Sequence, residues 1–146
     1  MSMASPESVV ILDGNLRSAL AATRSLGARG IRVLVGDERA DTLAGASRYC
    51  AERLRDPSLT RPAPFVRWIA EETARRGVRV VLPMSEVTTR LLLEYRSDLP
   101  AVTVPFGSFD SFQILNDKAT LGDLARRLGI RTPRTRPVRS RAELAA

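Results

Sequence analysis

The sequence predicts an α/β fold, with a parallel sheet of about four strands between two layers of helices. Short runs of Val, Ile and Leu alternate with amphipathic segments of helical period from residue 9 to residue 104. Strand–helix–strand connections of this kind are right-handed, and they give parallel strands that helices cover on both faces. The 146-residue chain is 44% hydrophobic and 27% charged, as expected of one domain with a well-buried core.

The first strand and helix are predicted from their apolar spacing. Residues 9–12 (Val-Val-Ile-Leu) form a continuous apolar run, which is typical of a strand covered on both faces. Asn15 is predicted to cap the following helix, whose apolar stripe begins at Leu16. Gly30 is expected to stop this helix, and residues 31–35 are the second predicted strand.

The middle of the chain continues the alternation less regularly. Residues 40–55 begin with small side chains and predict a short helix before the break at Asp56-Pro57. A clearer helix is expected to begin at Pro62 and to end at Gly77. Residues 78–82, again continuous and apolar, are the third predicted strand.

A further helix and strand complete the predicted sheet. Ser85 is expected to cap a helix whose apolar positions are Val87, Leu91, Leu92 and Tyr95. Residues 101–104, which lie between two prolines, are the fourth predicted strand. The order of these elements predicts a three-layer α/β/α, Rossmann-like domain.

After residue 104 the alternation gives way to helices. Residues 108–115 predict a short helix, and Asp117 is expected to cap a second helix that Gly129 ends. This C-terminal helical pair is followed by an Arg/Pro-rich tail. The predicted organisation is a polar start at residues 1–8, disordered or left over from cloning, a Rossmann-like domain at 9–115, and a last segment at 116–146.

Composition excludes several classes of site. The chain has no histidine and a single cysteine, Cys50, so we expect neither histidine catalysis nor a metal site. It also has neither an apolar signal segment nor an apolar run that could cross a bilayer. We therefore expect a cytoplasmic protein that does not enter membranes.

The net charge of +7 invites a nucleic-acid interpretation. Most arginines are scattered, and no aromatic side chains interleave with a basic cluster, so we expect no nucleic-acid partner from most of the chain. The tail is the exception, because its arginines fall close together: Arg131, Arg134, Arg136, Arg139 and Arg141.

Candidate ligand contacts lie where the predicted strands end. Ligands of open parallel sheets bind beyond the carboxyl ends of the strands. These ends carry Asp13-Gly14-Asn15 after the first strand, Gly36-Asp37-Glu38 after the second, and Pro83-Met84 with Ser85 and Glu86 after the third. Each also has a structural explanation, in a turn, a cap or a favourable first-turn charge. The glycine-rich dinucleotide and P-loop patterns are absent, and no catalytic residue is assigned.

Lys118 stands out because it is the only lysine beside 22 arginines. It follows the predicted cap Asp117, in a first helical turn where a cation opposes the helix dipole unless an anion binds there. A compact ammonium suits a phosphate oxygen, although a solvated surface lysine is the alternative explanation.

The stretch from Asn116 to Leu121, followed by Leu128-Gly129-Ile130 and then Pro133-Arg134-Thr135, resembles the entry to an ATP-grasp module. The earlier alternation resembles the pre-ATP-grasp domain of the same ligases. The stretches Ser47-Arg48-Tyr49 and Leu82–Glu86 are similar to segments that follow its second and third strands. Residues 9–115 would then be the pre-ATP-grasp domain of a carbamoyl-phosphate-synthase-like or carboxylate–amine ligase, and residues 116–146 a linker helix and the beginning of the ATP-grasp module.

The resemblance implies an ATP-dependent ligase that activates a carboxylate as an acylphosphate and joins it to an amine or another nucleophile. It implies that Lys118 contacts ATP phosphates and that Gly14, Asn15, Ser85 and Glu86 face the small-molecule carboxylate substrate. Magnesium ligands and the remaining ATP contacts belong to parts of such a module that these residues do not include. We therefore expect a fragment that is inactive alone and whose partner is the rest of the module in the same polypeptide.

Two other functions are compatible with the sequence. One is a self-contained Rossmann-like module that binds a ligand or a protein partner. The other is a basic nucleic-acid-binding protein that uses the Arg-rich tail. An exposed sheet edge also predicts that the chain can form a homodimer.

Overall fold

The structure, a computed structural model, describes residues 7–135, 138 and 140–144. It divides into two compact units, unit 1 (Met1–Phe106) and unit 2 (Gly107–Ala146). Most of the predicted polar start at residues 1–8 lies outside the described residues, as do Arg136 and Arg139 of the predicted basic tail.

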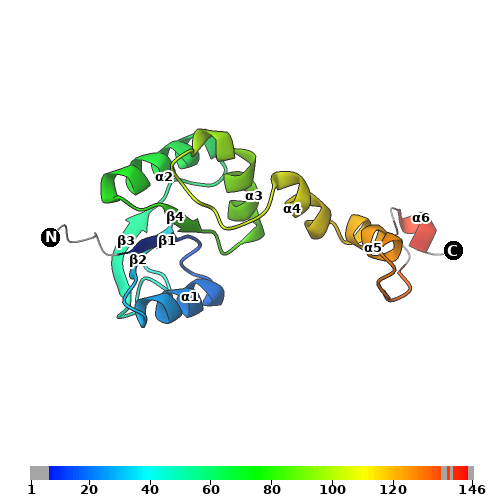
Figure 1. The fold of residues 1–146 in the computed structure, drawn as a ribbon, viewed down its shortest axis with the longest axis horizontal. Helices are drawn as coiled ribbons and strands as arrows, with labels where there is room; N and C mark the ends of the chain where they lie inside the picture. Colours follow the sequence, from blue (N-terminus) through cyan, green and yellow to red (C-terminus); the bar gives the residue numbers. More distant parts are fainter. Residues whose placement is uncertain (1–6, 136–137, 139, 145–146) are drawn as a thin grey trace. The chain divides into compact units, whose positions relative to one another are not determined.

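Unit 1 is built on a four-stranded parallel sheet, in the order β3-β2-β1-β4 (Figure 1). The strands are β1 (Ser8–Ile11), β2 (Arg32–Asp37), β3 (Cys50–Arg55) and β4 (Val80–Leu82). Every pair of neighbouring strands is parallel, so the carboxyl ends of all four strands share one edge of the sheet. The α/β prediction with about four parallel strands is confirmed.

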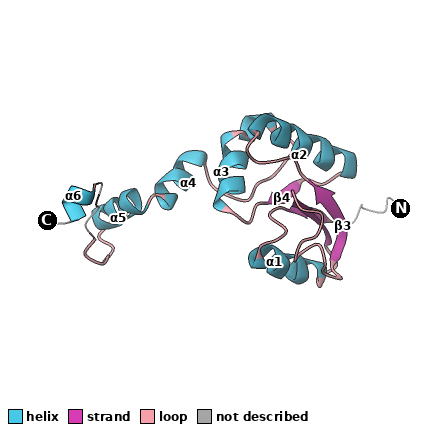
Figure 2. Cartoon of the chain, turned by 180° about the vertical axis from the view of Figure 1, so that it is seen from behind, coloured by secondary structure: helices cyan, strands magenta, loops and turns pink. Residues whose placement is uncertain are grey.

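Helices cover both faces of this sheet. Helix α1 (Arg17–Gly27) lies on one face, and α2 (Pro62–Arg76) and α3 (Glu86–Glu94) lie on the other (Figure 2). On the α1 face the core contains Val9, Ile11 and Ala19. The intervening residue, Val10, is equally buried, as a strand with two covered faces requires. The predicted three-layer, Rossmann-like arrangement is therefore confirmed.

The prediction of a fourth strand at residues 101–104 is wrong, because this segment does not form a strand. This segment forms one parallel bridge, between Val80 and Thr103. The Thr103 amide donates to the Arg79 carbonyl, and the Val81 amide donates to the Thr103 carbonyl. The segment ends at Pro105, which has no N–H group, so the ladder cannot continue there.

The short helix predicted within residues 40–55 is also wrong, because its last part is strand β3. Three of the six residues in β3 are charged, and only Leu54 is buried. An edge strand tolerates this composition, since one side of it has no neighbouring strand and exposed charges discourage pairing with other chains. A search for continuous apolar runs therefore missed it.

Glu52 ties this edge strand to the rest of unit 1. Its carboxylate accepts hydrogen bonds from Arg32 on β2, at 3.0 Å, and from Arg76 at the end of α2. Arg76 also pairs with Glu72 one turn earlier in α2. The hydrogen bonds from Arg76 hold the pKa of Glu52 below its usual range.

The helix caps follow the sequence at some positions only. Ser85 and Asp117 accept hydrogen bonds from Thr88 and Thr120 and so cap α3 and α5 as predicted. Asn15 does not cap α1, because the helix begins one residue later and Leu16, which has no side-chain acceptor, occupies the cap position. Val87, one of the apolar positions predicted for this helix, is instead 59% exposed.

Unit 2 is helical. It contains α4 (Phe109–Asn116), α5 (Lys118–Arg127) and the short α6 (Arg141–Leu144), so the predicted helical pair at 108–115 and 117–128 is confirmed. Gly129 has φ of 72° and follows α5 as the expected stop. No helix in the described parts of the chain combines the length and the apolar character needed to cross a membrane.

Two buried helix threonines give a matched test of the packing in unit 1. Thr23 is fully buried and its hydroxyl lacks a hydrogen-bond partner among the described residues, whereas Thr73 is 2% exposed and donates to the Ile69 carbonyl at 2.6 Å. Thr23→Val is expected to raise the free energy of unfolding by about 1 kcal/mol, because it removes an unsatisfied buried hydroxyl. Thr73→Val should give no such gain. Urea unfolding followed by fluorescence of Trp68, the single tryptophan, measures both, and equal effects of the two substitutions would contradict the assignment.

Candidate functional site

The candidate site is the edge of the sheet where the four parallel strands end. The segments that leave this edge are Leu12–Asn15 after β1, Asp37-Glu38 at the end of β2, Asp56 after β3 and Pro83–Glu86 after β4. Polar side chains gather here because each buried strand must turn into a loop at the same level. Ligands of open α/β sheets bind at this edge.

Asp13 connects two of these segments. One of its carboxylate oxygens accepts hydrogen bonds from the amides of Met84 and Ser85, each at 2.8 Å, and from the Thr88 hydroxyl at 2.6 Å. The other oxygen accepts one from the Ser85 hydroxyl at 3.0 Å. Asp13 thus fixes the start of α3 against the end of β1.

Asp13 is also the non-glycine residue with positive φ, 59°, among those that the structure describes. A left-handed backbone costs an ordinary L-residue about 1–2 kcal/mol, although aspartate tolerates it better than most. The four hydrogen bonds offset this cost, because an anionic acceptor makes stronger hydrogen bonds than a neutral one. No sequence pattern links Asp13 to these partners, because they lie 71 to 75 residues away along the chain.

Gly14 lies beside Asp13 and is buried. Its amide donates to the Gly36 carbonyl at 3.1 Å, and its carbonyl accepts from the Ala44 amide at 2.9 Å. A Cβ at this position would stand 2.6 Å from Val35 Cγ1, so the glycine allows the loop to pack against β2. The structure therefore gives Gly14 a packing role at the site.

The other three predicted substrate-side residues lie at the same edge. Asn15 is exposed, and its amide donates to Asp37 Oδ2 at 3.0 Å. Ser85 is half-buried and bound to Asp13, while Glu86 is exposed in the first turn of α3. Two sequence segments about 70 residues apart are therefore brought to one edge, with Asp13 as their direct link.

An acidic cluster, which we define as Asp13, Asp37, Glu38 and Asp56, occupies the same edge. Burial and the charges of Asp37, Glu38 and Asp13 raise the pKa of Asp56 to about 7. Sequence reasoning missed Asp56 because β3 was not recognised. The rule that ligand-site residues follow strand ends would have included it otherwise.

Lys118 lies in unit 2, in the first turn of α5, and is exposed. The Asp117 side chain before it caps the helix, and the hydrogen bond from the Thr120 amide holds the pKa of Asp117 below its usual range. The Lys118 ammonium is therefore open to solvent at the start of the helix that Asp117 caps.

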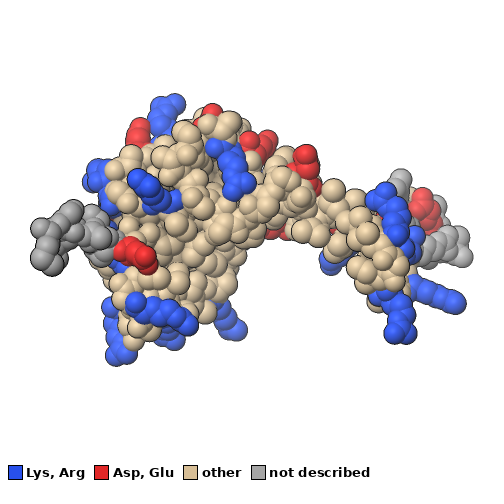
Figure 3. All heavy atoms as spheres, in the orientation of Figure 1, with Lys and Arg blue, Asp and Glu red and all other residues tan. Residues whose placement is uncertain are grey.

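The charged side chains of unit 1 can be followed on one face of the molecule. In Figure 3, Lys and Arg side chains are spread over the visible face of this unit, with uncharged and acidic residues between them. Within the described ranges, no three Cys, Asp or Glu side chains are placed to hold a metal ion.

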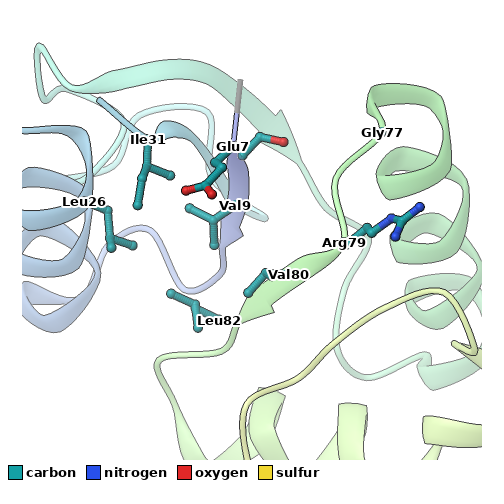
Figure 4. Close-up of a pocket in the computed structure, with 9 residues that line it drawn as sticks. Glu7, Val9, Leu26, Ile31, Gly77, Arg79, Val80 and Leu82 are labelled. Carbon is teal, nitrogen blue, oxygen red and sulfur yellow. The ribbon is translucent and has the colours of Figure 1, made fainter. Parts of the chain in front are cut away.

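An apolar groove of about 520 Å³ lies at the opposite end of the strands (Figure 4). Leu26 and Ile31 line it from the α1 side, and Val9, Val80 and Leu82 line it from the sheet. Ser8, at the beginning of β1, and Arg79, just before β4, also line it, and it reaches along β4 to Leu82.

The sequence matches no protein-family model and no curated protein. Solved structures with a similar fold include the biotin carboxylase domain of a single-chain bacterial carboxylase, at 20% identity and a TM-score of 0.65, covering 97% of this chain and 33% of that one. L-amino acid ligase from Bacillus licheniformis is similar at 12% identity and a TM-score of 0.66, covering 90% of this chain and 32% of that one.

A third similar structure is the biotin carboxylase domain dimer of 2-oxoglutarate carboxylase from Hydrogenobacter thermophilus, in complex with MgADP, ADP and bicarbonate. It is 12% identical with a TM-score of 0.59, covering 86% of this chain and 28% of that one. The chain spans about a third of the length of the solved chains it matches. Those proteins are ATP-grasp ligases, and the match falls on their N-terminal part. The chain therefore has the fold of the N-terminal part of ATP-grasp ligases.

Proposed function

We propose that this chain is the N-terminal part of an ATP-dependent ligase. The complete enzyme would activate a small carboxylate as an acylphosphate and join it to an amine or another nucleophile. This part alone would not catalyse the reaction, because phosphoryl transfer depends on metal ions and positioning groups from the rest of the module. The observation that carries the proposal is the fold match, which runs through unit 1 and into unit 2.

The carboxyl edge of the sheet would form the substrate side. Asn15, Ser85 and Glu86 lie at this edge, where open α/β sheets bind ligands. Gly14 supports them through its backbone hydrogen bonds and its contact with Val35. Asp13 would hold the two segments at a constant separation while substrate binds.

Lys118 would contact the nucleotide phosphates. Its ammonium is exposed at the N-terminal end of α5, where the helix dipole favours an anion. ATP with Mg²⁺ is the nucleotide that we propose, in line with the MgADP in the 2-oxoglutarate carboxylase structure. The magnesium ligands would come from the rest of the ligase, which would be a cytoplasmic enzyme and, like that carboxylase domain, a dimer.

Lys118→Ala in the complete enzyme is expected to reduce ATP-dependent ADP release at least tenfold, either through a higher KM for ATP or a lower kcat. A tenfold loss corresponds to about 1.4 kcal/mol of lost interaction with the phosphates. Steady-state assays over a range of MgATP concentrations measure both constants.

Arg127→Ala is the matched control, because Arg127 is an exposed cation at the other end of the same helix. It should leave both constants near the wild-type values. If Lys118→Ala left kcat and the KM for ATP unchanged, Lys118 would not contact the nucleotide phosphates. If the complete wild-type protein had no ATP-dependent activity, the ligase proposal itself would be contradicted.

A further inference from the structure

The turn after β1 is held by residues 42–45, which belong to the loop between β2 and β3. The Ala44 amide donates to the Gly14 carbonyl at 2.9 Å, and Ala44 is fully buried in the core on the α1 face. The Gly45 amide donates to the Thr42 hydroxyl at 3.0 Å, so the segment is closed by a hydrogen bond of its own. This loop segment therefore reaches the turn after β1 as a compact piece of backbone.

Arg53 on β3 fixes this loop segment from the other side. Its Nε–H group donates to the Gly45 carbonyl at 2.9 Å, in a partly buried place. Its Nη1 atom lies 3.6 Å from a carboxylate oxygen of Asp41, whose side chain is 98% exposed. An ion pair so open to solvent contributes little, so the hydrogen bond to Gly45 is the contact through which Arg53 holds the segment.

The sheet closes these contacts into a ring. Arg53 is opposite Val35 in the register of β2 and β3, and the next residue of β2, Gly36, accepts a hydrogen bond from the Gly14 amide. Strand β3 is itself anchored at the residue before Arg53, through the ion pairs of Glu52. The turn after β1 is thus bound to β2 through its N–H group, and to β3 through its carbonyl, the loop segment and Arg53.

We propose that Arg53 is a positioning residue for the substrate side of the site. Its Nε–H group holds residues 42–45 against Gly14 and thereby sets where Asn15 meets the substrate. Asn15 is exposed and directly follows Gly14, so a shift of the Gly14 carbonyl moves it. Arg53 acts through the loop segment and not by contact with the substrate. The inference rests on the proposed function, because it is there that Asn15 is assigned to the substrate.

Two substitutions at Arg53 isolate the hydrogen bond to Gly45. Arg53→Gln and Arg53→Met both remove the positive charge and the ion pair with Asp41, and both new side chains extend as far as the Nε atom of arginine. They differ in that glutamine places an N–H donor at the Nε position, whereas methionine has no donor. A difference between the two variants therefore reports the hydrogen bond and not the charge.

Hydrogen exchange on the chain described here tests whether Arg53 holds the turn. In Arg53→Met the amides of Ala44 and Gly45 should exchange at least about fivefold faster than in the wild type, because the segment opens locally at a lower cost. The Asn15 amide should also exchange faster, while the Val10 amide in β1 should not change. Arg53→Gln should exchange like the wild type. Equal exchange in Arg53→Met and the wild type would overturn the proposal.

Kinetics of the complete enzyme test whether the position of the turn affects the substrate. ADP release is measured against the concentrations of bicarbonate, acetate and L-alanine as carboxylate probes. Arg53→Met should raise the KM for the probe that the wild type uses by at least about threefold, with kcat and the KM for MgATP near the wild-type values. Arg53→Gln should restore the KM. A purely structural role would instead lower the active fraction, and therefore kcat, without changing the KM.

Arg48→Met is the matched control, because Arg48 is an exposed arginine of the same loop whose guanidinium contacts the neighbouring Tyr49. It should leave the KM for the probe unchanged. Faster exchange in Arg53→Met with an unchanged KM, or an equal rise of the KM in Arg53→Gln, would overturn the positioning role. If the wild type released no ADP with any probe, the ligase proposal and the substrate role of Arg53 would both fail, while hydrogen exchange would still decide whether Arg53 holds the turn.

Discussion

Asp13→Ala is expected to lower the free energy of unfolding of unit 1 by about 3 kcal/mol, because it removes an anionic acceptor that binds two amides and two hydroxyls. Part of this cost is the desolvation of the Met84 and Ser85 amides, which lose their partner in a half-buried place. Alanine is also less tolerant than aspartate of the positive φ at this position. Urea unfolding followed by Trp68 fluorescence measures the change.

Two variants test whether the hydrogen bonds cause the loss. Asp13→Asn keeps one oxygen acceptor and the tolerance for positive φ, so it should cost about half as much. Asp41→Ala removes an aspartate whose ion pair with Arg53 is exposed, so it should cost less than about 0.5 kcal/mol.

Hydrogen exchange locates the effect. The amides of Met84 and Ser85 should exchange faster in Asp13→Ala, because they lose their hydrogen-bond acceptor, while amides in β2 should change less. If the stability of Asp13→Ala were within 0.5 kcal/mol of wild type, Asp13 would not be the link between β1 and α3.

The parts of this fold that could be predicted from sequence are those that depend on neighbours along the chain. The apolar run of β1, the proline at the start of α2 and the Ser85 cap each act within a few residues. Strand β3 could not be predicted in this way. Its six residues become a strand because β2 offers them a free edge and because Arg32 and Arg76 neutralise Glu52.

The same distinction applies to the candidate site. The rule for parallel sheets correctly placed Gly14, Asn15, Ser85 and Glu86 at one edge, although their contacts with ligands remain predictions. It did not reveal that Asp13 joins these segments, because Thr88 lies 75 residues away in the sequence. Asp56 became visible only when β3 was placed beside β2.

Gly14→Ala is expected to destabilise unit 1 by about 2–3 kcal/mol, although it adds a single methyl group. The new Cβ would lie 2.6 Å from Val35 Cγ1 and 3.0 Å from Thr42 Oγ1, which is closer than side-chain atoms approach. Overpacking of a buried position typically costs 1–3 kcal/mol, since either the loop or β2 must move. Urea unfolding again measures the loss.

Removing the opposing methyl group is the sharpest control. Val35→Ala alone leaves a cavity and destabilises the core. In the Gly14→Ala background it also relieves the clash. The double variant should therefore lose at least about 1 kcal/mol less stability than the sum of the two single losses. Gly30→Asn should be nearly neutral, because Gly30 has no atom within 4 Å of its Cβ position and asparagine tolerates its φ of 81°. Additive effects of Gly14→Ala and Val35→Ala would rule out the clash.

The result also decides how loss of activity in Gly14 variants of the complete enzyme should be interpreted. A residue that faces substrate can be changed at little cost to stability, whereas one that packs against β2 cannot. If Gly14→Ala unfolds as expected, its effect on catalysis reports the position of the β1 loop, and the exposed Asn15 becomes the residue through which substrate contact at this loop is tested.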